Sequence, residues 1–170
     1  MKLGINSFMV NEETHDGPKI FLNRLKQSII KNKLAEVRNI FHPFYNLQMR
    51  LESYQHAQNH GISAAKNILG HNSPYTQIPW MWSDQFDLNL QLVGICNDFD
   101  QEIQRGDILE EGIIYFFLKN NKIIGACGIG IAGKVGRDIR LAGKISESNI
   151  EIKIEELKNT EIKLNKLLKK

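Results

Sequence analysis

Two tryptophans placed two residues apart are the most chemically suggestive side chains in the chain. Trp80 and Trp82 stand in the segment PWMWSDQFDLNLQL, residues 79–92. Polar side chains follow them: Asp84, Gln85 and Asp87. In an extended segment, residues i and i+2 share a face, and large aromatic side chains are seldom exposed without a function. The pair is therefore either a core anchor or a binding platform, and periodicity alone leaves both interpretations open.

A glycine-rich motif offers a second kind of chemistry. Residues 128–133 spell GxGxxG between a predicted strand and a predicted helix, which is the local context of a dinucleotide-binding fingerprint. Lys134 nearly completes a phosphate-binding loop, but Val135 stands where a hydroxyl is needed. No second parallel strand ending in an acidic residue follows. The motif therefore favours a closely packed glycine-rich strand end over a nucleotide site.

Histidines at helical spacing offer a third kind of chemistry, which is metal binding. His56 and His60 are four residues apart, a spacing that can chelate a metal, and His42 and His71 are possible further ligands. No carboxylate or thiol completes a recognisable ligand pattern. Solvated surface histidines are therefore the favoured interpretation.

Composition limits the possible classes of protein. The chain has 170 residues, of which 42% are hydrophobic and 24% charged, as in ordinary globular proteins. A net charge of +3 gives no argument for nucleic acid or an anionic membrane as a partner. Cys96 and Cys127 have no CxxC pairing, so we expect buried free thiols in a reducing cytoplasm rather than a disulfide. Without a long apolar run or a signal peptide, we expect no membrane span.

The first forty residues predict one isolated strand–loop–helix unit. Residues 2–10 are strand-like, and Pro18 is well placed to begin a helix that continues to Arg38. His15 and Asp16 lie in the loop between them and would suit an active site or a turn equally well. One such unit cannot bury both faces of its strand by itself.

The rest of the chain predicts an α+β fold. A second helix is expected from Leu51 to Leu69, with an apolar stripe through Tyr54 and Ala57 and a stop at Gly70. After Ile78 the pattern becomes that of an antiparallel β-meander of about four to five strands packed with helices. The predicted strands cover residues 88–92, 102–106, 113–118 and 123–131, and Asn120–Asn121 form a hairpin turn.

The C-terminal part predicts further helices. Residues 134–145 are helical in pattern, and Ser148 with Glu151 suggests a capping box that opens a last amphipathic segment. We expect that segment to break near Asn159.

Four segments in order resemble a known family. They are RLESYQHAQNHG at 50–61, PWMWSDQFDLNLQLVGI at 79–95, FDQEIQRGD at 99–107 and IYFFLKNNKIIGA at 114–126. Together with the tail at 154–169, they are similar to the C-terminal domain of FAD-dependent NAD(P)H:ferredoxin reductases of oxygenase systems, which are related to rubredoxin and putidaredoxin reductases. The resemblance covers about residues 41–170.

The resemblance implies a site as well as a fold. In that family, an FAD-containing enzyme takes hydride from NAD(P)H and passes single electrons to a ferredoxin. Trp80 and Trp82 would then lie near the flavin, which favours the platform interpretation. Glu52, Ser53 and Gln55 would stand at a helix N-terminus beside the flavin pyrimidine, where the helix dipole stabilises a reduced, anionic ring.

The family pattern is incomplete in this chain. Its two dinucleotide fingerprints and the Gly-Asp-Cys-like segment that holds the flavin are not found, and residues 36–40 read EVRNI instead. We therefore expect an oxidoreductase remnant, inactive alone, that retains no FAD. The alternatives are a non-enzymatic docking module for a ferredoxin or flavoprotein, and a glycosyltransferase-derived fragment. Exposure of the surface around the tryptophans is expected to promote self-association.

Residues 1–40 resemble a different protein family from the rest of the chain. The segment MKLGINSFMVNEETHDGPKIFLNRLKQSIIK is similar to the N-terminus of a bacterial family of glycosyltransferases. Two domains are therefore expected, at 1–40 and 41–170, joined by a gene fusion.

Overall fold

The computed structural model describes residues 40–107, 112–131, 133 and 135–169, and every structural statement below concerns these residues. The chain divides into two compact units, Met1–Gln77 and Ile78–Lys170. Each unit is described by itself. The predicted strand and helix before residue 40, together with His15 and Asp16, lie outside the described residues. The predicted domain boundary at 40/41 stays a prediction.

The first unit contains a small hairpin and one helix. Strands β1 (Ile40–His42) and β2 (Leu47–Met49) pair antiparallel, with Ile40 opposite Met49. The helix α2 (Tyr54–Ile68) follows, and the hydroxyl of its N-cap residue Ser53 accepts a hydrogen bond from the His56 N–H at 3.3 Å. This cap places the start of the helix three residues after the predicted one, because Ser53 satisfies a free N–H of the first turn.

The end of α2 is the predicted one. Gly70 has a φ of +103°, a left-handed conformation that glycine adopts without steric cost. Its N–H donates to the Asn67 carbonyl, and the His71 N–H donates to the Lys66 carbonyl, both at 3.1 Å. These two bonds form a Schellman motif, so the predicted glycine stop is confirmed.

The second unit is an antiparallel sheet with helices, which confirms the predicted α+β class. Its strands are β3 (Trp80–Gln85), β4 (Leu88–Gly94), β5 (Gln101–Asp107), β6 (Gly112–Lys119) and β7 (Lys122–Ile131). Their spatial order is β3-β4-β7-β6-β5, so β7 pairs with both β4 and β6. The link after β4 therefore crosses to the far edge of the sheet, which a simple meander would not require.

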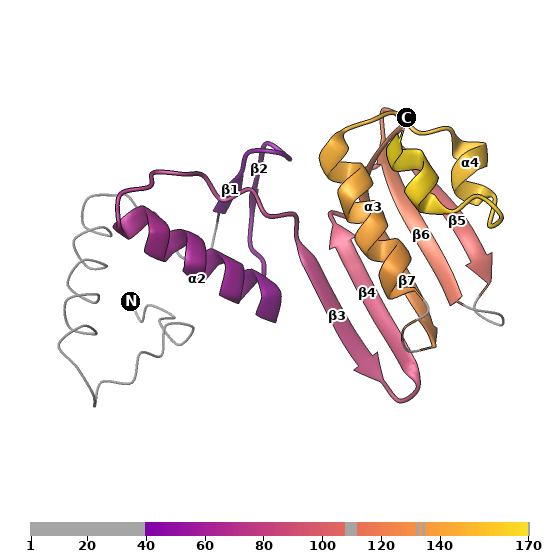
Figure 1. Ribbon diagram of the computed structural model, residues 1–170, viewed down its shortest axis with the longest axis horizontal. Helices are drawn as coiled ribbons and strands as arrows, with labels where there is room; N and C mark the ends of the chain where they lie inside the picture. The colour runs from indigo at the N-terminus through magenta and orange to yellow at the C-terminus, as the bar shows by residue number, and fades with distance from the viewer. Residues whose placement is uncertain (1–39, 108–111, 132, 134, 170) are drawn as a thin grey trace. The chain divides into compact units, whose positions relative to one another are not determined.

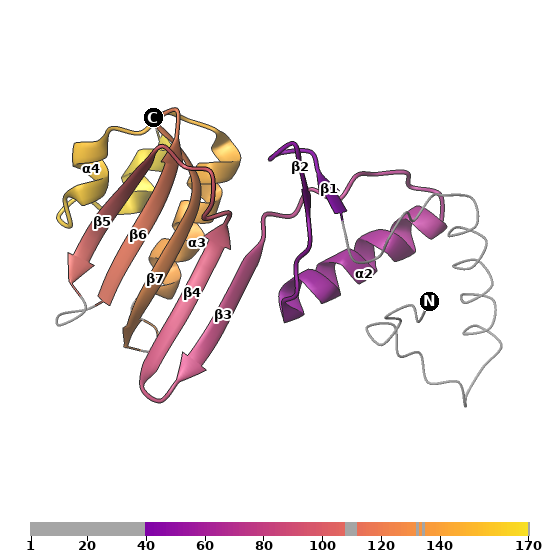
Figure 2. The same ribbon diagram turned by 180° about the vertical axis from the view of Figure 1, so that it is seen from behind.

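One face of this sheet carries the helices. Helix α3 (Gly136–Ser148) lies across β4 and β7, as Figure 1 shows, while α4 (Ile154–Lys158) and the 3-10 helix η2 (Leu164–Lys169) complete the layer. The view from behind shows the five strands with no described helix across them (Figure 2). The largest fully buried side chains of this unit lie between the sheet and these helices: Phe116, Leu118, Ile139, Ile145, Leu157, Leu164 and Leu167.

Two local predictions in this unit have different outcomes. Asn120 and Asn121 have φ values of +51° and +60°, as expected for the tight turn that joins β6 to β7. The capping box at Ser148 is wrong, because α3 continues to this residue and the Ser148 hydroxyl donates to the Ile145 carbonyl at 2.7 Å. The predicted break near Asn159 is confirmed, since α4 ends at Lys158.

The two faces of β4 are the reverse of what its composition suggests. Asn89 and Gln91 are buried, at 7% and 9% exposure, whereas Leu88 is 39% exposed. Gln91 packs under the first turn of α3, where a Cβ on Gly136 would lie only 2.6 Å from its amide nitrogen. The leucines instead face the side of the sheet that no described helix covers. Period-two alternation identified the strand but not which face the helix would cover.

Candidate functional site

The two tryptophans stack on one another along the outer strand of the sheet. Trp80 and Trp82 belong to β3, and their ring centroids are 4.9 Å apart with an interplanar angle of 27°. Trp80 is half-buried and packs against the hydrophobic core, whereas Trp82 is 38% exposed. The predicted shared face is confirmed, and the two interpretations apply to different members of the pair. Trp80 is the anchor, and Trp82 presents an aromatic surface to solvent.

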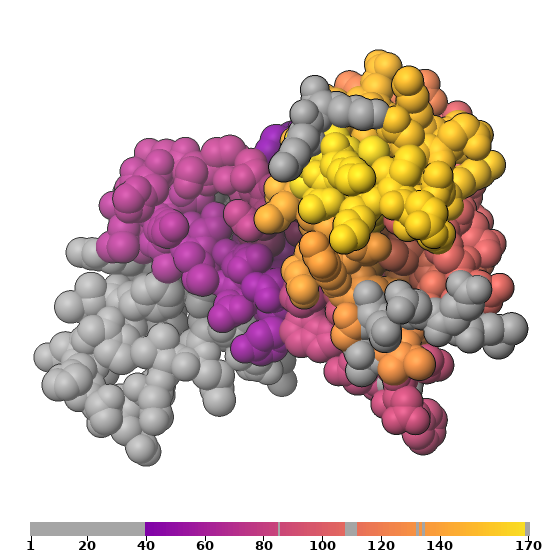
Figure 3. All heavy atoms as spheres, turned by 45° about the vertical axis from the view of Figure 1, so that its right-hand side comes forward, coloured from indigo at the N-terminus to yellow at the C-terminus, as the bar shows by residue number. Residues whose placement is uncertain are grey.

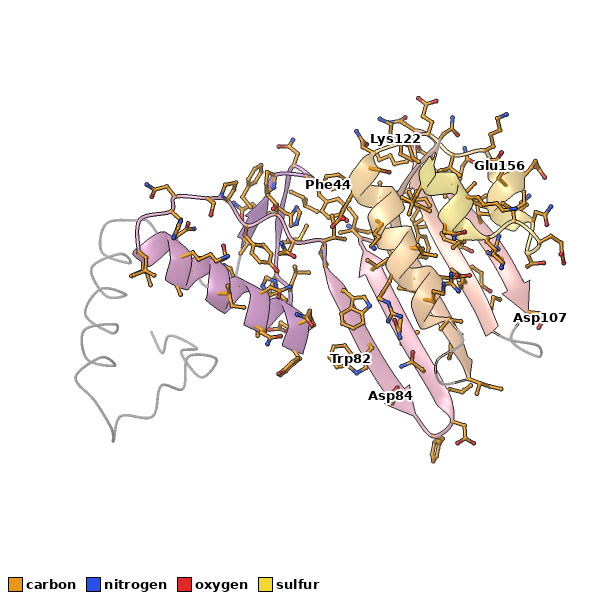
Figure 4. The ribbon with its side chains drawn as sticks, in the orientation of Figure 1. Phe44, Trp82, Asp84, Asp107, Lys122 and Glu156 are labelled. Carbon is orange, nitrogen blue, oxygen red and sulfur yellow. The ribbon has the colours of Figure 1, made fainter. Side chains whose placement is uncertain are left out.

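A row of polar side chains continues the same face toward the end of the hairpin. Trp82 lies opposite Gln91 in the strand register, and Asp84 lies opposite Asn89. The Gln91 amide donates to the Asn89 carbonyl oxygen at 2.7 Å, and the Asn89 amide donates to the Asp84 carboxylate at 2.6 Å. Buried amides thus hold an exposed carboxylate in one orientation beside the exposed indole. The labels in Figure 4 mark Trp82 and Asp84 on β3.

The amino-acid sequence alone does not reveal this polar row. Asn89 and Gln91 alternate with leucines, a pattern that favours a solvent-facing position for the two amides. The sequence signal for this row is that Asp84, Asn89 and Gln91 lie close together in the chain. Once the two strands pair, each amide can donate a hydrogen bond to the next polar side chain. Together, Trp82 and Asp84 form a surface suited to a planar ring or to an apolar protein side chain next to a cationic one.

The other predicted site residues belong to the first unit. Glu52 is exposed and forms an ion pair with Arg50, and Ser53 caps α2. Gln55 donates to Asn59 on the next turn of the helix at 3.0 Å. All three therefore mark the start of a helix, as predicted. Their nearness to a flavin stays a prediction, since they and the tryptophans belong to different compact units.

The glycine motif is a packing feature. Gly128 and Gly130 lie within β7, and a Cβ on Gly128 would be 3.0 Å from the Ile139 side chain of α3. Glycine thus lets the helix approach the sheet closely. The favoured interpretation of a closely packed strand end holds, and β7 is antiparallel to both neighbours, unlike the first strand of a dinucleotide-binding unit.

The histidines of α2 form a partly buried aromatic cluster with Tyr75, which corrects the surface interpretation. His56 is only 8% exposed, and it stacks on His60 with ring centroids 5.1 Å apart. The ring nitrogen Nδ1 of His56 lies 3.1 Å from the Tyr75 hydroxyl. The predicted stripe is also wrong at Tyr54, which is 71% exposed. The helix buries its histidine face because the rings find stacking and hydrogen-bonding partners there.

Burial changes the titration of this cluster. It lowers the pKa of His56 to about 4, with contributions from the nearby His60 and His42, and it lowers the pKa of His60. It also raises the pKa of Tyr75 to about 12. All three groups are therefore neutral at neutral pH. Within the described residues, no group of three potential ligands is arranged to hold a metal ion.

We expect acid to destabilise the first unit through His56. Between about pH 6.5 and 4 the unfolded chain binds a proton that the folded chain does not, so the free energy of unfolding falls as the pH decreases through this window. The expected loss is about 2–3 kcal/mol. It is measured as reduced hydrogen-exchange protection of α2 amides at pH 4.5 relative to pH 7, after correction for intrinsic exchange rates.

The matched control is the exposed His71. Substitution of His56 by Gln should remove most of this pH dependence, whereas His71→Gln at the exposed position should leave it unchanged. A histidine Cε1 proton of His56 that titrates near pH 6.5 would contradict the prediction.

The two described cysteines do not form a disulfide. Cys96 and Cys127 are both free and half-buried, and burial raises the pKa of both thiols, that of Cys96 to about 11. Both thiols are therefore weak nucleophiles at neutral pH.

No helix in the described ranges is long and apolar enough to cross a membrane.

Comparison with known proteins identifies relatives of this chain by sequence similarity. The chain is 35% identical over 112 residues to the ferredoxin–NAD(+) reductase component of the anthranilate 1,2-dioxygenase system of Burkholderia cepacia, covering 65% of this chain and 27% of that protein. It is 32% identical over 94 residues to the 5,5'-dehydrodivanillate O-demethylase ferredoxin reductase subunit of a Sphingobium strain, covering 55% and 21%. The chain thus spans about a quarter or less of these relatives.

Solved structures share the fold. The ferredoxin reductase for the CYP199A2 system of Rhodopseudomonas palustris matches with a TM-score of 0.66 and 31% identity, over 75% of this chain and 30% of that one. The reductase in the putidaredoxin reductase–putidaredoxin complex matches with a TM-score of 0.64 and 21% identity, over 77% and 30%, which shows the fold alone.

The family match coincides with the second compact unit. Residues 80–168 match the family described as Reductase C-terminal, and this range begins at Trp80 and ends within η2. It therefore includes the tryptophan stack, the polar row and all five strands of the sheet. The chain belongs to the reductase C-terminal domain family, and the relatives described above are ferredoxin reductases of oxygenase systems.

Proposed function

We propose that residues 41–170 act as the C-terminal domain of an FAD-dependent NAD(P)H:ferredoxin oxidoreductase and are not catalytic by themselves. The observation that carries the proposal is the stacked pair on β3, in which half-buried Trp80 supports exposed Trp82. A rigid, exposed indole is a contact that either a flavin ring or a ferredoxin can use. The names of the relatives support the ferredoxin reductase assignment.

The described residues fit contact with a flavin only in part. Trp82 offers a planar aromatic surface, and the N-terminus of α2 after Ser53 offers a positive dipole end. The antiparallel setting of Gly128 does not fit the pyrophosphate of a dinucleotide. When bound, FAD would accept a hydride and release electrons singly. In this proposal the chain supplies the aromatic and dipolar contacts, and a separate dinucleotide-binding part holds the cofactor.

The docking role extends to proteins supplied in trans. A domain that retains Trp82 and Asp84 but no dinucleotide fold among its described residues can still bind a ferredoxin or a flavoprotein. We propose a ferredoxin as the partner, since one solved relative is a reductase in complex with putidaredoxin. The predicted self-association through the exposed tryptophan surface is the competing use of the same face.

The test is a titration of isotope-labelled putidaredoxin with the purified chain. We expect resonance shifts around the iron–sulfur cluster of putidaredoxin, and a loss of at least about tenfold in affinity for Trp82→Ala, as for a central aromatic at an interface. Trp80→Phe keeps an aromatic anchor and is the matched control. Absence of any shift at millimolar concentration would refute ferredoxin docking.

The same sample tests the cofactor part of the proposal. The part of the chain that the structure describes holds no dinucleotide-binding unit, so we expect the purified protein to be colourless and not to quench the fluorescence of added FAD. Visible flavin absorbance that co-purifies with the protein would contradict that part, whatever the result with putidaredoxin.

A further inference from the structure

A pocket of about 360 Å³ lies in the first unit, between α2 and the segment that follows it. The helix contributes one face to the pocket, which consists of Asn59, Ile62, Ser63 and Lys66. The opposite wall is formed by residues 73–77, which run back past the helix, as Figures 1 and 2 show. Figure 3 shows the purple spheres of α2 and the magenta spheres of this segment packed together at the surface of the unit. A pocket of this size suits a small molecule.

Hydrogen bonds and ring contacts fix both walls of the pocket. The Asn67 side-chain amide donates to the Ser73 carbonyl, and its oxygen accepts from the Ser73 N–H, both at 2.8 Å. The Tyr75 hydroxyl lies 3.1 Å from the Nδ1 atom of His56, and the Tyr75 ring meets that of His60 at a centroid distance of 5.2 Å. The segment is thus tied to the helix at two points. A ligand therefore does not need to order the pocket before it binds.

The charge of the pocket comes from Lys66. Among the described residues that line it, Lys66 is the charged one. Among the described residues of the first unit, Glu52 is the one carboxylate, and it pairs with Arg50, so the Lys66 ammonium has no anionic partner within them. Ser63 and Thr76 add hydroxyl groups that have no hydrogen-bond partner among the described residues. An ammonium and two hydroxyls are donors for an anion, so the pocket selects a negatively charged ligand.

The donors of the pocket suit a carboxylate better than a phosphate. Phosphate sites use arginine forks or several backbone N–H groups at a helix N-terminus. The described lining contains no arginine and follows the side of α2 rather than its start. Ile62, Pro74 and the Tyr75 ring add apolar contact area next to the donors. One positive charge beside an apolar wall fits a single carboxylate on a small apolar body.

The C-terminal end of α2 opposes an anion only weakly. The negative end of a helix dipole acts within about the last turn. There the Gly70 and His71 N–H groups donate to the carbonyls of Asn67 and Lys66. The pocket extends back to Asn59 in the second turn of the helix. The full charge of the Lys66 ammonium therefore dominates the electrostatics of the pocket.

We propose that this pocket binds a small organic monocarboxylate, with the carboxylate on Lys66 and the apolar body against Ile62 and Pro74. The hydroxyls of Ser63 and Thr76 orient the carboxylate by donating to its oxygens. The pocket belongs to a different compact unit from the tryptophan pair on β3. The inference therefore goes beyond the proposed function and does not depend on it.

The test is a titration of the intact, isotope-labelled chain with sodium benzoate, followed through the backbone amide resonances. We expect shifts within residues 59–77 that saturate at about millimolar concentrations. Benzamide has the same ring without the charge and should bind at least about fivefold more weakly. Inorganic phosphate should also bind at least about fivefold more weakly, because the pocket offers no arginine fork. Sodium chloride at the same ionic strength should not cause these shifts.

Variants of Lys66 show whether its charge carries the binding. Lys66→Met keeps a long side chain without the charge and should weaken benzoate binding about fivefold, whereas Lys66→Arg should retain binding within about twofold. The exposed Lys144 on α3 provides the matched control, and Lys144→Met should bind like the unchanged chain. Lys66 is itself exposed, so its variants should fold normally. Unchanged resonances of His56 and Tyr75 verify this.

Four results would overturn the inference. They are equal binding of benzoate to Lys66→Met, equal binding of benzamide, phosphate binding as tight as that of benzoate, and no saturable shift by about 50 mM benzoate. Each of them leaves the docking of putidaredoxin untouched. Loss of putidaredoxin binding in Trp82→Ala likewise leaves the carboxylate pocket in place.

Discussion

Substitution of Arg105 by Ala should lower the free energy of unfolding of the second unit by about 3–4 kcal/mol, a large part of the stability of a small domain. Arg105 lies on β5 and is only 7% exposed. Its guanidinium donates to four backbone carbonyls of the C-terminal segment. The acceptors and distances are Leu157 at 2.9 Å, Asn159 at 2.6 Å, Thr160 at 3.2 Å and Ile162 at 2.8 Å.

The loss of stability arises from the backbone carbonyls that Arg105→Ala leaves without a hydrogen-bond donor. The Leu157 carbonyl lies in the last turn of α4 and the other three follow the helix, where carbonyls lack the regular intrahelical donors, so the guanidinium of buried Arg105 supplies hydrogen bonds to them. Truncation leaves several acceptors without a donor, and each buried orphan costs about 1–3 kcal/mol when it cannot reach water. Arg105→Lys should recover less than half of the loss, because an ammonium cannot present the planar fork that reaches four oxygens.

Tryptophan fluorescence during urea unfolding measures this effect. Both tryptophans of the chain lie on β3, so the signal reports on the second unit. The exposed Arg140 on α3 provides the matched control, and its change to Ala should alter stability by less than about 0.5 kcal/mol. If the two alanine variants unfold at the same urea concentration, the carbonyl contacts of Arg105 contribute nothing.

Substitution of Gly125 by Ala should lower the stability of the same unit by at least about 3 kcal/mol. A Cβ at this position would lie 2.0 Å from the Ile95 carbonyl oxygen and 2.7 Å from its carbon. These are backbone atoms just past the end of β4, where the Ile95 N–H donates to the Ile124 carbonyl at 3.0 Å. They cannot move away without breaking the pairing of β4 with β7.

Gly128→Ala is the graded comparison for Gly125→Ala. Its Cβ would meet the tip of the Ile139 side chain at 3.0 Å, and a side chain can shift by a few tenths of an ångström. We expect a loss of about 1 kcal/mol or less, measured in the same urea experiment. A larger effect at Gly128 than at Gly125 would show that the approach of α3, rather than the strand crossing, requires glycine most.

The two substitutions bear on function because the candidate site depends on the sheet. Gly125 lies opposite Gly94 at the end of the β4–β7 pair, and β4 holds β3 with its tryptophans. Variants at Gly125 should therefore lose putidaredoxin binding together with stability. Variants at Trp82 should lose binding alone, which separates a contact residue from a structural one.

Local signals in the sequence predicted several features correctly. Asn120 and Asn121 predicted a tight hairpin turn because asparagine tolerates a positive φ, and Gly70 predicted a helix end for the same reason. The i, i+2 spacing of Trp80 and Trp82 predicted a shared face. Each of these signals concerns backbone geometry within a few residues, so no distant part of the chain was needed.

Other features required contacts between distant residues. Arg105 meets carbonyls more than 50 positions away, and its role within RGD has no local signal. His56 is buried because Tyr75 reaches it from 19 positions further along the chain. Helical spacing alone could not separate this arrangement from a solvated pair of histidines.

The sequence by itself determined the family, the α+β class and the strand that carries the tryptophans, because these depend on motif order and local periodicity. The tertiary structure alone decided which face of β4 is buried. Helix α3 packs on Gln91 through Gly136, on the face away from the leucines, and the Gln91 amide donates to Asn89, which in turn donates to Asp84 and positions it. Period-two alternation is symmetric between the faces of a strand, so only the packing of the helix could distinguish them.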